Sequence, residues 1–180
     1  MQTLSQTDLT SILAHTPKDI RELVQKRNLI IGGGFIRARI LGEKPSDIDL
    51  FGSSAQVLLD SANEIATERG QDTRRYKTDN AFTVITPGRT PIQFITRWLF
   101  TDPEALISSF DFTICQACIY SLNGKWQSVC GDTFYQDLAG KRLVYTHPVR
   151  HEDAGGSLMR VRKFLSRGYW IQAQSLAGVI

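Results

Sequence analysis

The sequence has few cysteines and no long apolar run, and both features narrow the class of protein. Its three cysteines are an odd number, and without a secretion signal this favours reduced thiols over a disulfide framework. No apolar stretch approaches the roughly 18 residues of a membrane span. The N-terminus MQTLSQTDLTSILAHT lacks the basic start and apolar centre of a secretory signal. We therefore predict a soluble, cytoplasmic protein without a membrane segment.

The chain also lacks internal repeats, low-complexity tracts and a Pro/Gly/Ser-rich linker. Its composition, with 42% hydrophobic and 22% charged residues, argues against a disordered or fibrous protein. A length of 180 residues is enough to bury a real core. We expect one main domain over residues 1–150, followed by a basic helical segment over residues 151–180.

Positive charge is concentrated near the C-terminus, although the net charge is only +3. Residues 141–170 contain seven Lys or Arg against two acidic residues, Glu152 and Asp153, which is a local excess of five. Such a segment suits a polyanion such as RNA or a nucleoside triphosphate. The alternative is a solvated helix face, and charge alone does not separate the two.

Hydrophobic spacing predicts helices that alternate with strands, followed by a hairpin. Residues 111–120 fit either a strand or a buried helix, and Asn123-Gly124 fits a turn. The whole pattern predicts an α+β protein with a small mixed sheet flanked by helices. Helices are expected over 5–27 with a break at Pro17, and over 35–41, 55–69, from 101–104 onward, 134–138 and 157–170; strands are expected over 28–31, 47–51, 80–85, 92–96 and 143–145.

Two aspartates lie one residue apart in an apolar run, at Asp47 and Asp49. In a strand, alternate side chains point to the same face, so both carboxylates should face one side while Ile48 enters the core. Paired carboxylates repel each other unless a cation lies between them. A hard divalent ion such as Mg²⁺ binds carboxylate and phosphate oxygens together and supports displacement at phosphorus. We predict that this pair binds Mg²⁺, with Mn²⁺ as the alternative ion.

Glycines precede the aspartate pair at a predicted strand-to-helix turn. Gly33 and Gly34 would allow backbone N–H groups to approach a phosphate. Arg37, one turn into the following helix, would reach the same triphosphate. Each signal is weak when taken separately, but their order along the chain is specific.

These residues resemble the nucleotidyltransferase head of class II CCA-adding enzymes and bacterial poly(A) polymerases. That family carries G-G-x-V-R-D and then D-I-D, and this chain has 33–38 GGFIRA and 47–49 DID. Residues 111–114, DFTI, resemble the family's D-F-T-I, which implies that Asp111 lies near the sugar of the incoming nucleotide. Residues 160–164, RVRKF, resemble the family's R-A-x-R-F at the start of its neck, which implies that Arg160 and Lys163 face base or phosphate. The implied fold is that of DNA polymerase β-like nucleotidyltransferases.

The chain also departs from the family pattern at several positions. Ser109-Phe110 replaces the arginine pair before D-F-T, Cys115 replaces its asparagine, and Ala38 replaces its acid. Gln93 stands where many nucleotidyltransferases have a third carboxylate. The base-reading E-D-x-x-R is represented only by Glu152-Asp153, and Ser157 takes the place of its arginine when the helix is aligned from Arg160. Base selection and tRNA handling are therefore in question.

Other candidate sites have simpler interpretations. Cys115, Cys118 and Cys130 with His147 and His151 would be an irregular zinc site, and buried reduced thiols are favoured instead. The tryptophans at 98, 126 and 170 are expected to be packing residues, although Trp170 lies beside basic residues that could contact RNA.

Two functional hypotheses follow from these motifs. The first is an enzyme in which Asp47 and Asp49 support transfer of a nucleoside monophosphate from a nucleoside triphosphate to an acceptor hydroxyl. The acceptor would be an RNA 3′ end or, for a nucleotidylating toxin, a tRNA, a protein or a small molecule. The second is a catalytically inactive module that binds nucleotide or RNA. The sequence gives no indication of the oligomeric state.

Overall fold

The computed structural model describes residues 1–148 and 154–180 of the chain. Two helices, α1 (Gln6–His15) and α2 (Lys18–Arg27), begin the fold and are separated at Pro17. The Ser5 side chain accepts a hydrogen bond from the backbone N–H of Asp8, which caps α1. Asn28 ends α2 in the left-handed conformation. The chain then turns directly into the sheet, so the helix ends fix where the first strand begins.

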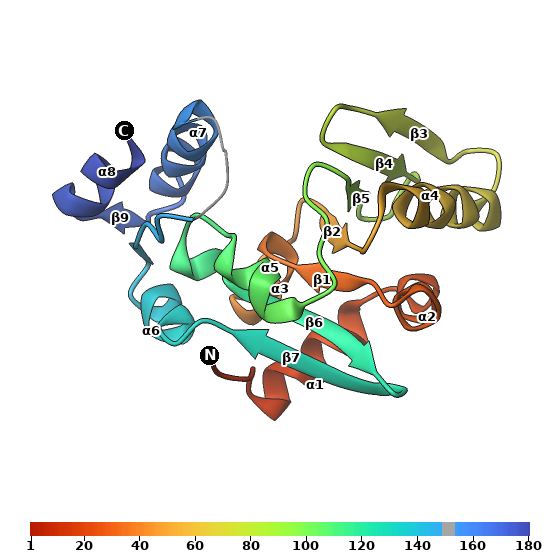
Figure 1. The fold of residues 1–180 in the computed structure, drawn as a ribbon, viewed down its shortest axis with the longest axis horizontal. Helices are drawn as coiled ribbons and strands as arrows, with labels where there is room; N and C mark the ends of the chain where they lie inside the picture. Colours follow the sequence, from red (N-terminus) through yellow and green to blue (C-terminus); the bar gives the residue numbers. More distant parts are fainter. Residues whose placement is uncertain (149–153) are drawn as a thin grey trace.

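The central sheet within the described residues has seven strands in the order β3-β4-β5-β2-β1-β6-β7 (Figure 1). Strand β1 (Ile30–Gly32) pairs antiparallel with β2 (Ile48–Phe51) and with β6 (Ala117–Leu122), while β2 pairs parallel with β5 (Ile92–Ile95). The sheet is therefore mixed. The remaining strands are β3 (Arg74–Lys77), β4 (Ala81–Ile85) and β7 (Lys125–Cys130).

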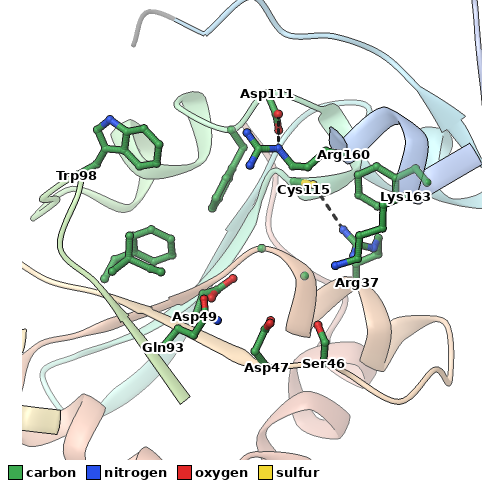
Figure 2. A pocket seen from close by; sticks show the side chains of 16 residues that line it. Arg37, Ser46, Asp47, Asp49, Gln93, Trp98, Asp111, Cys115, Arg160 and Lys163 are labelled. Atoms are coloured by element: carbon green, nitrogen blue, oxygen red, sulfur yellow. Dashed lines mark hydrogen bonds and ion pairs between the residues drawn. The ribbon is translucent and has the colours of Figure 1, made fainter. Parts of the chain in front are cut away.

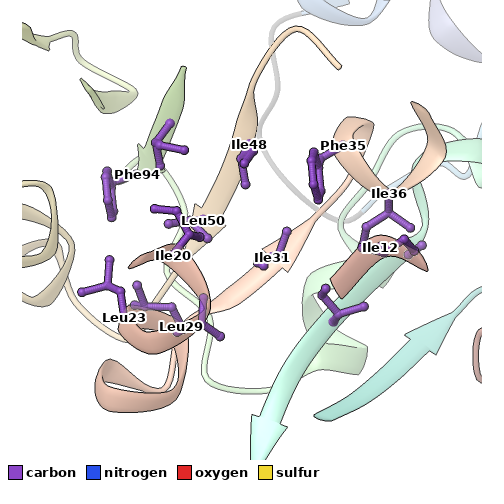
Figure 3. Close-up of a cluster of buried hydrophobic side chains, with 14 of the residues drawn as sticks. Ile12, Ile20, Leu23, Leu29, Ile31, Phe35, Ile36, Ile48, Leu50 and Phe94 are labelled. Atoms are coloured by element: carbon purple, nitrogen blue, oxygen red, sulfur yellow. The ribbon is translucent and has the colours of Figure 1, made fainter. Parts of the chain in front are cut away.

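Helices α3 (Gly34–Ile40) and α4 (Ala55–Arg69) follow β1 and β2 along the chain. Together with α1 and α2 they bury apolar side chains against the sheet. The largest fully buried ones include Phe35, Phe94 and Ile12 (Figure 3). Ile48 and Leu50 belong to this core, so alternation along β2 leaves the two aspartates on the opposite face.

The C-terminal part packs on a second buried cluster. It contains a short helix η1 (Thr113–Cys115), α6 (Phe134–Ala139), β8 (Arg142–Leu143), α7 (Ala154–Leu165), β9 (Trp170–Ile171) and α8 (Ala173–Val179). Val161 and Phe164 of α7 lie in one cluster with Phe112 and Leu143. Helix α7 is thereby held beside η1 and β8. The predicted boundary at residues 150 and 151 lies outside the described residues and stays a prediction.

Most predicted elements are confirmed, and the differences have local causes. Strand β3 was not predicted because all four of its residues are exposed and show no alternation. Strand β7 after the Asn123-Gly124 turn and helix α8 were also not predicted. Residues 111–120 form η1 and then β6, so the strand alternative holds for the second half. The basic helix ends at Leu165 rather than at residue 170, because the chain turns at Gly168, whose φ is +84°.

One further helix, α5 (Pro103–Ser108), begins as predicted with Asp102 as its capping residue. No helix within residues 1–148 and 154–180 is both long enough and apolar enough to cross a membrane.

Candidate active site

A pocket of about 330 Å³ opens above the face of β2 that carries the aspartates. Figure 2 shows Asp47, Asp49 and Gln93 along its floor, Trp98 on one side, and Arg37 and Lys163 on the other. The pocket therefore brings together residues from the turn after β1 and from α3, β2, β5, α7 and the loop before η1. Its lining contains all eight residues predicted from the sequence motifs: Gly33, Gly34, Arg37, Asp47, Asp49, Asp111, Arg160 and Lys163.

Asp47 lies close enough to Asp49 to affect its charge. Burial, followed by the negative charge of Asp47, raises the pKa of Asp49 to about 7, and Lys163 and Arg37 oppose this rise. Asp49 is partly buried by its accessible surface. A carboxylate in this position is stabilised by a nearby cation. The geometry thus confirms the expected arrangement of the pair beside the glycine turn, although its catalytic role is a separate question.

Gly33 connects β1 to α3 with a backbone conformation that requires glycine. Its φ is +72° and its ψ is −129°, a region that residues with a Cβ rarely adopt. A Cβ built on Gly33 would lie 3.7 Å from the Phe110 ring and 3.9 Å from Oδ2 of Asp49. The Gly33 N–H donates to the carbonyl oxygen of Ala117 at 3.0 Å, so this N–H is already used by the sheet.

Arg37 is a buried cation that points into the pocket. Its side chain is held by two soft contacts: the guanidinium lies 4.7 Å from the centre of the Phe164 ring, and Nη1 donates to Sγ of Cys115 at 3.5 Å. Neither the ring nor the thiol neutralises the positive charge of the guanidinium. A buried guanidinium in this position is suited to hold an anionic ligand.

Asp111 is buried and is held from α7. Nε of Arg160 donates to Oδ2 of Asp111 at 2.6 Å, and Oγ of Ser157 donates to the same oxygen at 3.0 Å. Asp111 therefore ties α7 to the segment before η1. Lys163, one turn beyond Arg160, is exposed on the same helix and lines the pocket.

The donor set fits a divalent cation only in part. Asp47 and Asp49 supply two carboxylates on one face, and Gln93 lies beside Asp49 across the parallel strand pair. No cluster of three or more His, Cys, Asp or Glu residues suitable for a metal exists in the described part of the chain. An ion held here would complete its shell with phosphate and water oxygens, as Mg²⁺ commonly does.

The pocket also contains residues that the sequence motifs did not indicate. Phe51, Ile95, Trp98 and Phe110 form an apolar side, and Ser46 and Cys115 contribute polar or polarisable groups. Trp98 was predicted to be a packing residue, and it lies at the pocket edge with the Arg97 guanidinium 4.6 Å from its ring. The only sequence signal for this side was the replacement of an arginine by Phe110.

The remaining predicted residues are the cysteines, the acidic pair of the base-reading motif and Trp170. Cys115, Cys118 and Cys130 are free and buried, and burial raises the pKa of each thiol, to about 11, 12 and 11 respectively. Glu152 and Asp153, which were compared with the base-reading motif, lie outside the described residues, as does His151. Trp170 is exposed and donates from its indole N–H to the Gly140 carbonyl at 2.9 Å.

The fold matches solved structures of CCA-adding enzymes. The Thermotoga maritima CCA-adding enzyme complexed with tRNA is 19% identical with a TM-score of 0.69, and the match covers 99% of this chain and 45% of that one. A CCA-adding enzyme with CTP is 20% identical with a TM-score of 0.69, covering 99% and 46%. A tRNA nucleotidyltransferase with a primer tRNA and an ATP analog is 18% identical with a TM-score of 0.64, covering 87% and 48%.

This likeness confirms the predicted fold class, an α+β nucleotidyltransferase head with a mixed sheet. The chain spans less than half the length of the structures that it matches. At such low identity the likeness concerns the fold alone. No sequence among the curated proteins matches the chain.

A family model gives the more specific result. The model described as the Gabija anti-defense 2 family protein, Gad2, matches residues 3–141. This range includes both aspartates, the glycine turn and Asp111, and it is well over half of the chain. The expected resemblance to CCA-adding enzymes therefore holds at the level of fold, and the chain belongs to the Gad2 family.

Proposed function

We propose that this Gad2 chain is a metal-dependent nucleotidyltransferase that transfers a nucleoside monophosphate from a nucleoside triphosphate to an acceptor hydroxyl. The observation that carries the proposal is the aspartate pair itself. Asp47 and Asp49 face one pocket beside the Gly33 turn, opposite Arg37 and Lys163. Two carboxylates beside basic groups provide what phosphoryl-group chemistry needs, namely a place for a cation and a place for phosphates.

In this proposal Asp47 and Asp49 would hold Mg²⁺, or Mn²⁺ as the alternative. The bound ion would supply charge neutralisation at the reacting phosphate. Arg37 and Lys163 would bind the triphosphate oxygens, since both line the pocket with Asp49 and both oppose the rise of its pKa by burial. Gly33 and Gly34 would let the triphosphate approach the backbone, since a side chain at Gly33 would project between Phe110 and Asp49.

Helix α7 would close the nucleotide side of the pocket. Asp111 is proposed to contact the ribose, while it also holds Arg160 and Ser157 in place. Arg160 would then face base or phosphate only through the part of its guanidinium that the Asp111 contact does not occupy. This arrangement makes Asp111 both a ligand-binding and a positioning residue.

The relatives suggest which ligands to test. Their structures contain CTP, ATP or tRNA according to their descriptions, so a nucleoside triphosphate is the proposed donor and RNA is one candidate acceptor. The family description names an activity against the Gabija defence. We propose that transfer by this chain, in the cytoplasm, serves that purpose.

A second candidate function is an inactive module that binds nucleotide. It is favoured by Gln93, which faces Asp49 across the strand pair where a third carboxylate would be expected, and by Ser109-Phe110 in place of two arginines. Retention of both aspartates argues against it, because a like-charged pair without a cation costs stability.

Turnover distinguishes the two functions. The chain would be incubated with each of the four α-labelled nucleoside triphosphates and Mg²⁺, with pyrophosphate release and labelled products as readouts. Asp47→Asn and Asp49→Asn should each reduce turnover on the order of 10³-fold or more. Asp72→Asn removes an exposed carboxylate that does not line the pocket. It is the matched control, and its turnover should equal that of the unsubstituted chain. Nucleotide binding without pyrophosphate release in the unsubstituted chain would favour the inactive module.

A further inference from the structure

The two sides of the pocket differ in chemistry, and the difference bears on the acceptor. Figure 2 shows Arg37 and Lys163 on one side of the pocket and Trp98 on the other, with the aspartates between them. Arg160 also lines the pocket, and so do Phe51 and Phe110, whose rings contact each other. A triphosphate requires the basic side. The acceptor must therefore approach Asp47 and Asp49 from the aromatic side.

The aromatic side lies immediately next to the carboxylates. The Phe110 ring covers the Gly33 turn, where a built Cβ would be 3.7 Å from the ring and 3.9 Å from Oδ2 of Asp49. Phe51 supports this ring edge to face, with the ring centres 5.9 Å apart. A flat ring packed on this surface would thus hold a hydroxyl attached directly to it close to Asp49. Aromatic rings gain from such offset or edge contacts beyond the area that they bury.

Trp98 also lines a second hollow, a groove of about 620 Å³, so its ring stands between the pocket and this groove. The groove is formed by the segment after β5 and by α5, and its lining within the described residues includes a single charged side chain, Arg97. The guanidinium of Arg97 packs over the Trp98 ring. The remaining lining is apolar or small: Leu99, Phe100, Ala105, Ser108 and Ser109.

This lining is unsuited to a nucleic-acid strand. Binding to a phosphate backbone depends on several Lys or Arg contacts, whereas this groove offers Arg97 alone within the described residues. Further cations lie on the other side of the pocket, where Lys44 and Arg167 line a cavity adjoining Arg37. An uncharged segment with an aromatic group fits the groove better. The groove has room beyond the aromatic group itself, and the exposed Leu99 offers apolar surface to the flanking residues of a peptide.

We infer that the acceptor of the proposed transfer is the phenol of a tyrosine, presented by a protein segment that lies in the groove beside Trp98. The inference rests on the proposed function and specifies its substrate class. The phenolic oxygen forms a bond to the α-phosphorus of the nucleoside triphosphate. The bond from that phosphorus to the bridging oxygen breaks, pyrophosphate leaves with the electron pair, and the phenolic proton passes to water.

The test compares defined acceptors at equal concentration with an α-labelled nucleoside triphosphate and Mg²⁺. The probes are a short uncharged peptide with one central tyrosine, the same peptide with serine or phenylalanine instead, and a single-stranded oligoribonucleotide with a free 3′ hydroxyl. We expect label on the tyrosine peptide at least tenfold above the serine peptide and the oligoribonucleotide, and none on the phenylalanine peptide. Preferential labelling of the oligoribonucleotide, or equal labelling of serine and tyrosine, would overturn the inference and leave the proposed function standing. Absence of pyrophosphate release with every probe would overturn both.

Variants test the surface itself. Trp98→Ala should raise the KM for the tyrosine peptide by roughly three- to tenfold, as expected for one lost aromatic contact, and Trp98→Phe should restore most of it. Tyr76→Ala, an exposed aromatic on β3 outside both cavities, is the matched control and should leave the KM unchanged. Ser109→Arg, which adds a cation to the groove, should favour the oligoribonucleotide relative to wild type. An unchanged KM in Trp98→Ala would contradict the assigned surface.

Discussion

At the scale of single residues, Asp49 links the site to the stability of the fold. Burial and the charge of Asp47 raise its pKa to about 7, whereas an aspartate in the unfolded chain titrates near 3.8. Between these values the folded protein binds more protons than the unfolded protein. The free energy of unfolding of the metal-free protein should therefore fall as the pH rises from about 4 to about 7, and this contribution should level off above that range.

Urea unfolding at pH 5 and pH 8 in the presence of a chelator would measure this effect. The midpoint should be lower at pH 8, and Asp49→Asn should reduce the difference between the two pH values. Addition of Mg²⁺ at pH 8 should raise the midpoint if the pair binds the ion. If the urea midpoint rose from pH 5 to pH 8 by the same amount in the wild type and in Asp49→Asn, the pKa of Asp49 would not be raised.

Gly33 allows a second test at this scale. Because its φ of +72° with ψ of −129° suits glycine alone, Gly33→Ala should lower the free energy of unfolding by about 1–3 kcal/mol. Gly34→Ala is the control, since Gly34 begins α3 and has no positive φ, and alanine favours helix. Thermal or urea unfolding of both variants gives the comparison. Equal stability of the two would mean that the turn relaxes around the new side chain.

At the scale of elements, amphipathic patterns predicted the helices that pack on the sheet. They gave no signal for an element whose side chains are all exposed. Helices α1, α2 and α4 and the β4–β5 hairpin carry apolar residues at regular spacing, so their sequences specify them. Strand β3 is held by pairing with β4 and exposes every side chain, so hydrophobicity contains no signal for it. The end of α7 depends on the turn near Gly168, which a count of basic residues does not reveal.

The contact between Asp111 and helix α7 leads to a prediction at the scale of elements. Asp111 is almost fully buried, whereas the Arg160 side chain is 36% exposed. Loss of the arginine leaves a buried carboxylate that still accepts a hydrogen bond from Ser157 but has lost its cation, and such uncompensated charges cost about 3–5 kcal/mol. Loss of the carboxylate charge leaves an arginine that water can still reach. Arg160→Met should therefore destabilise the protein more than Asp111→Asn.

Urea unfolding of the two single variants and of the double variant would check this order. The double variant should be less destabilised than the sum of the two single effects, because removing both groups leaves neither charge without its partner. Strict additivity, or a larger effect of Asp111→Asn, would indicate that the contact does not hold α7 in place.

At the scale of the whole molecule, the site combines a part that motifs predict with a part that only folding brings together. Asp47, Asp49, Gly33 and Arg37 lie within one short stretch, so their spacing identified them. Trp98 follows β5, which pairs with β2, and Phe110 follows α5 and packs against Phe51 of β2, so only folding brings these side chains to the aspartates. The aromatic side of the pocket has no local pattern, and this is why the sequence did not predict it.

The site also predicts how the molecule discriminates among the bases of nucleoside triphosphates. Ser157 stands where an aligned family helix has an arginine, and its hydroxyl donates to Asp111. A hydroxyl offers one donor, whereas guanidinium offers a fixed bidentate fork. One lost bidentate contact weakens discrimination by about 1–3 kcal/mol, taking base readout in nucleic acids as a guide. We therefore expect kcat/KM values for the four nucleoside triphosphates that differ less than in an enzyme with that arginine.

Ser157→Arg, with the Asp111 contact of Arg160 kept, should sharpen the preference among nucleotides. Ser166→Arg, an exposed position past the end of α7, controls for the added charge.

The unsubstituted chain should not complete a CCA end on a tRNA, because its acceptor side is aromatic where the family has arginines. Ordered addition of C, C and A would contradict this, since a tRNA end would then have to bind beside Phe110 and Trp98, where Arg97 is the one cation among the described lining residues and a phosphate backbone requires several.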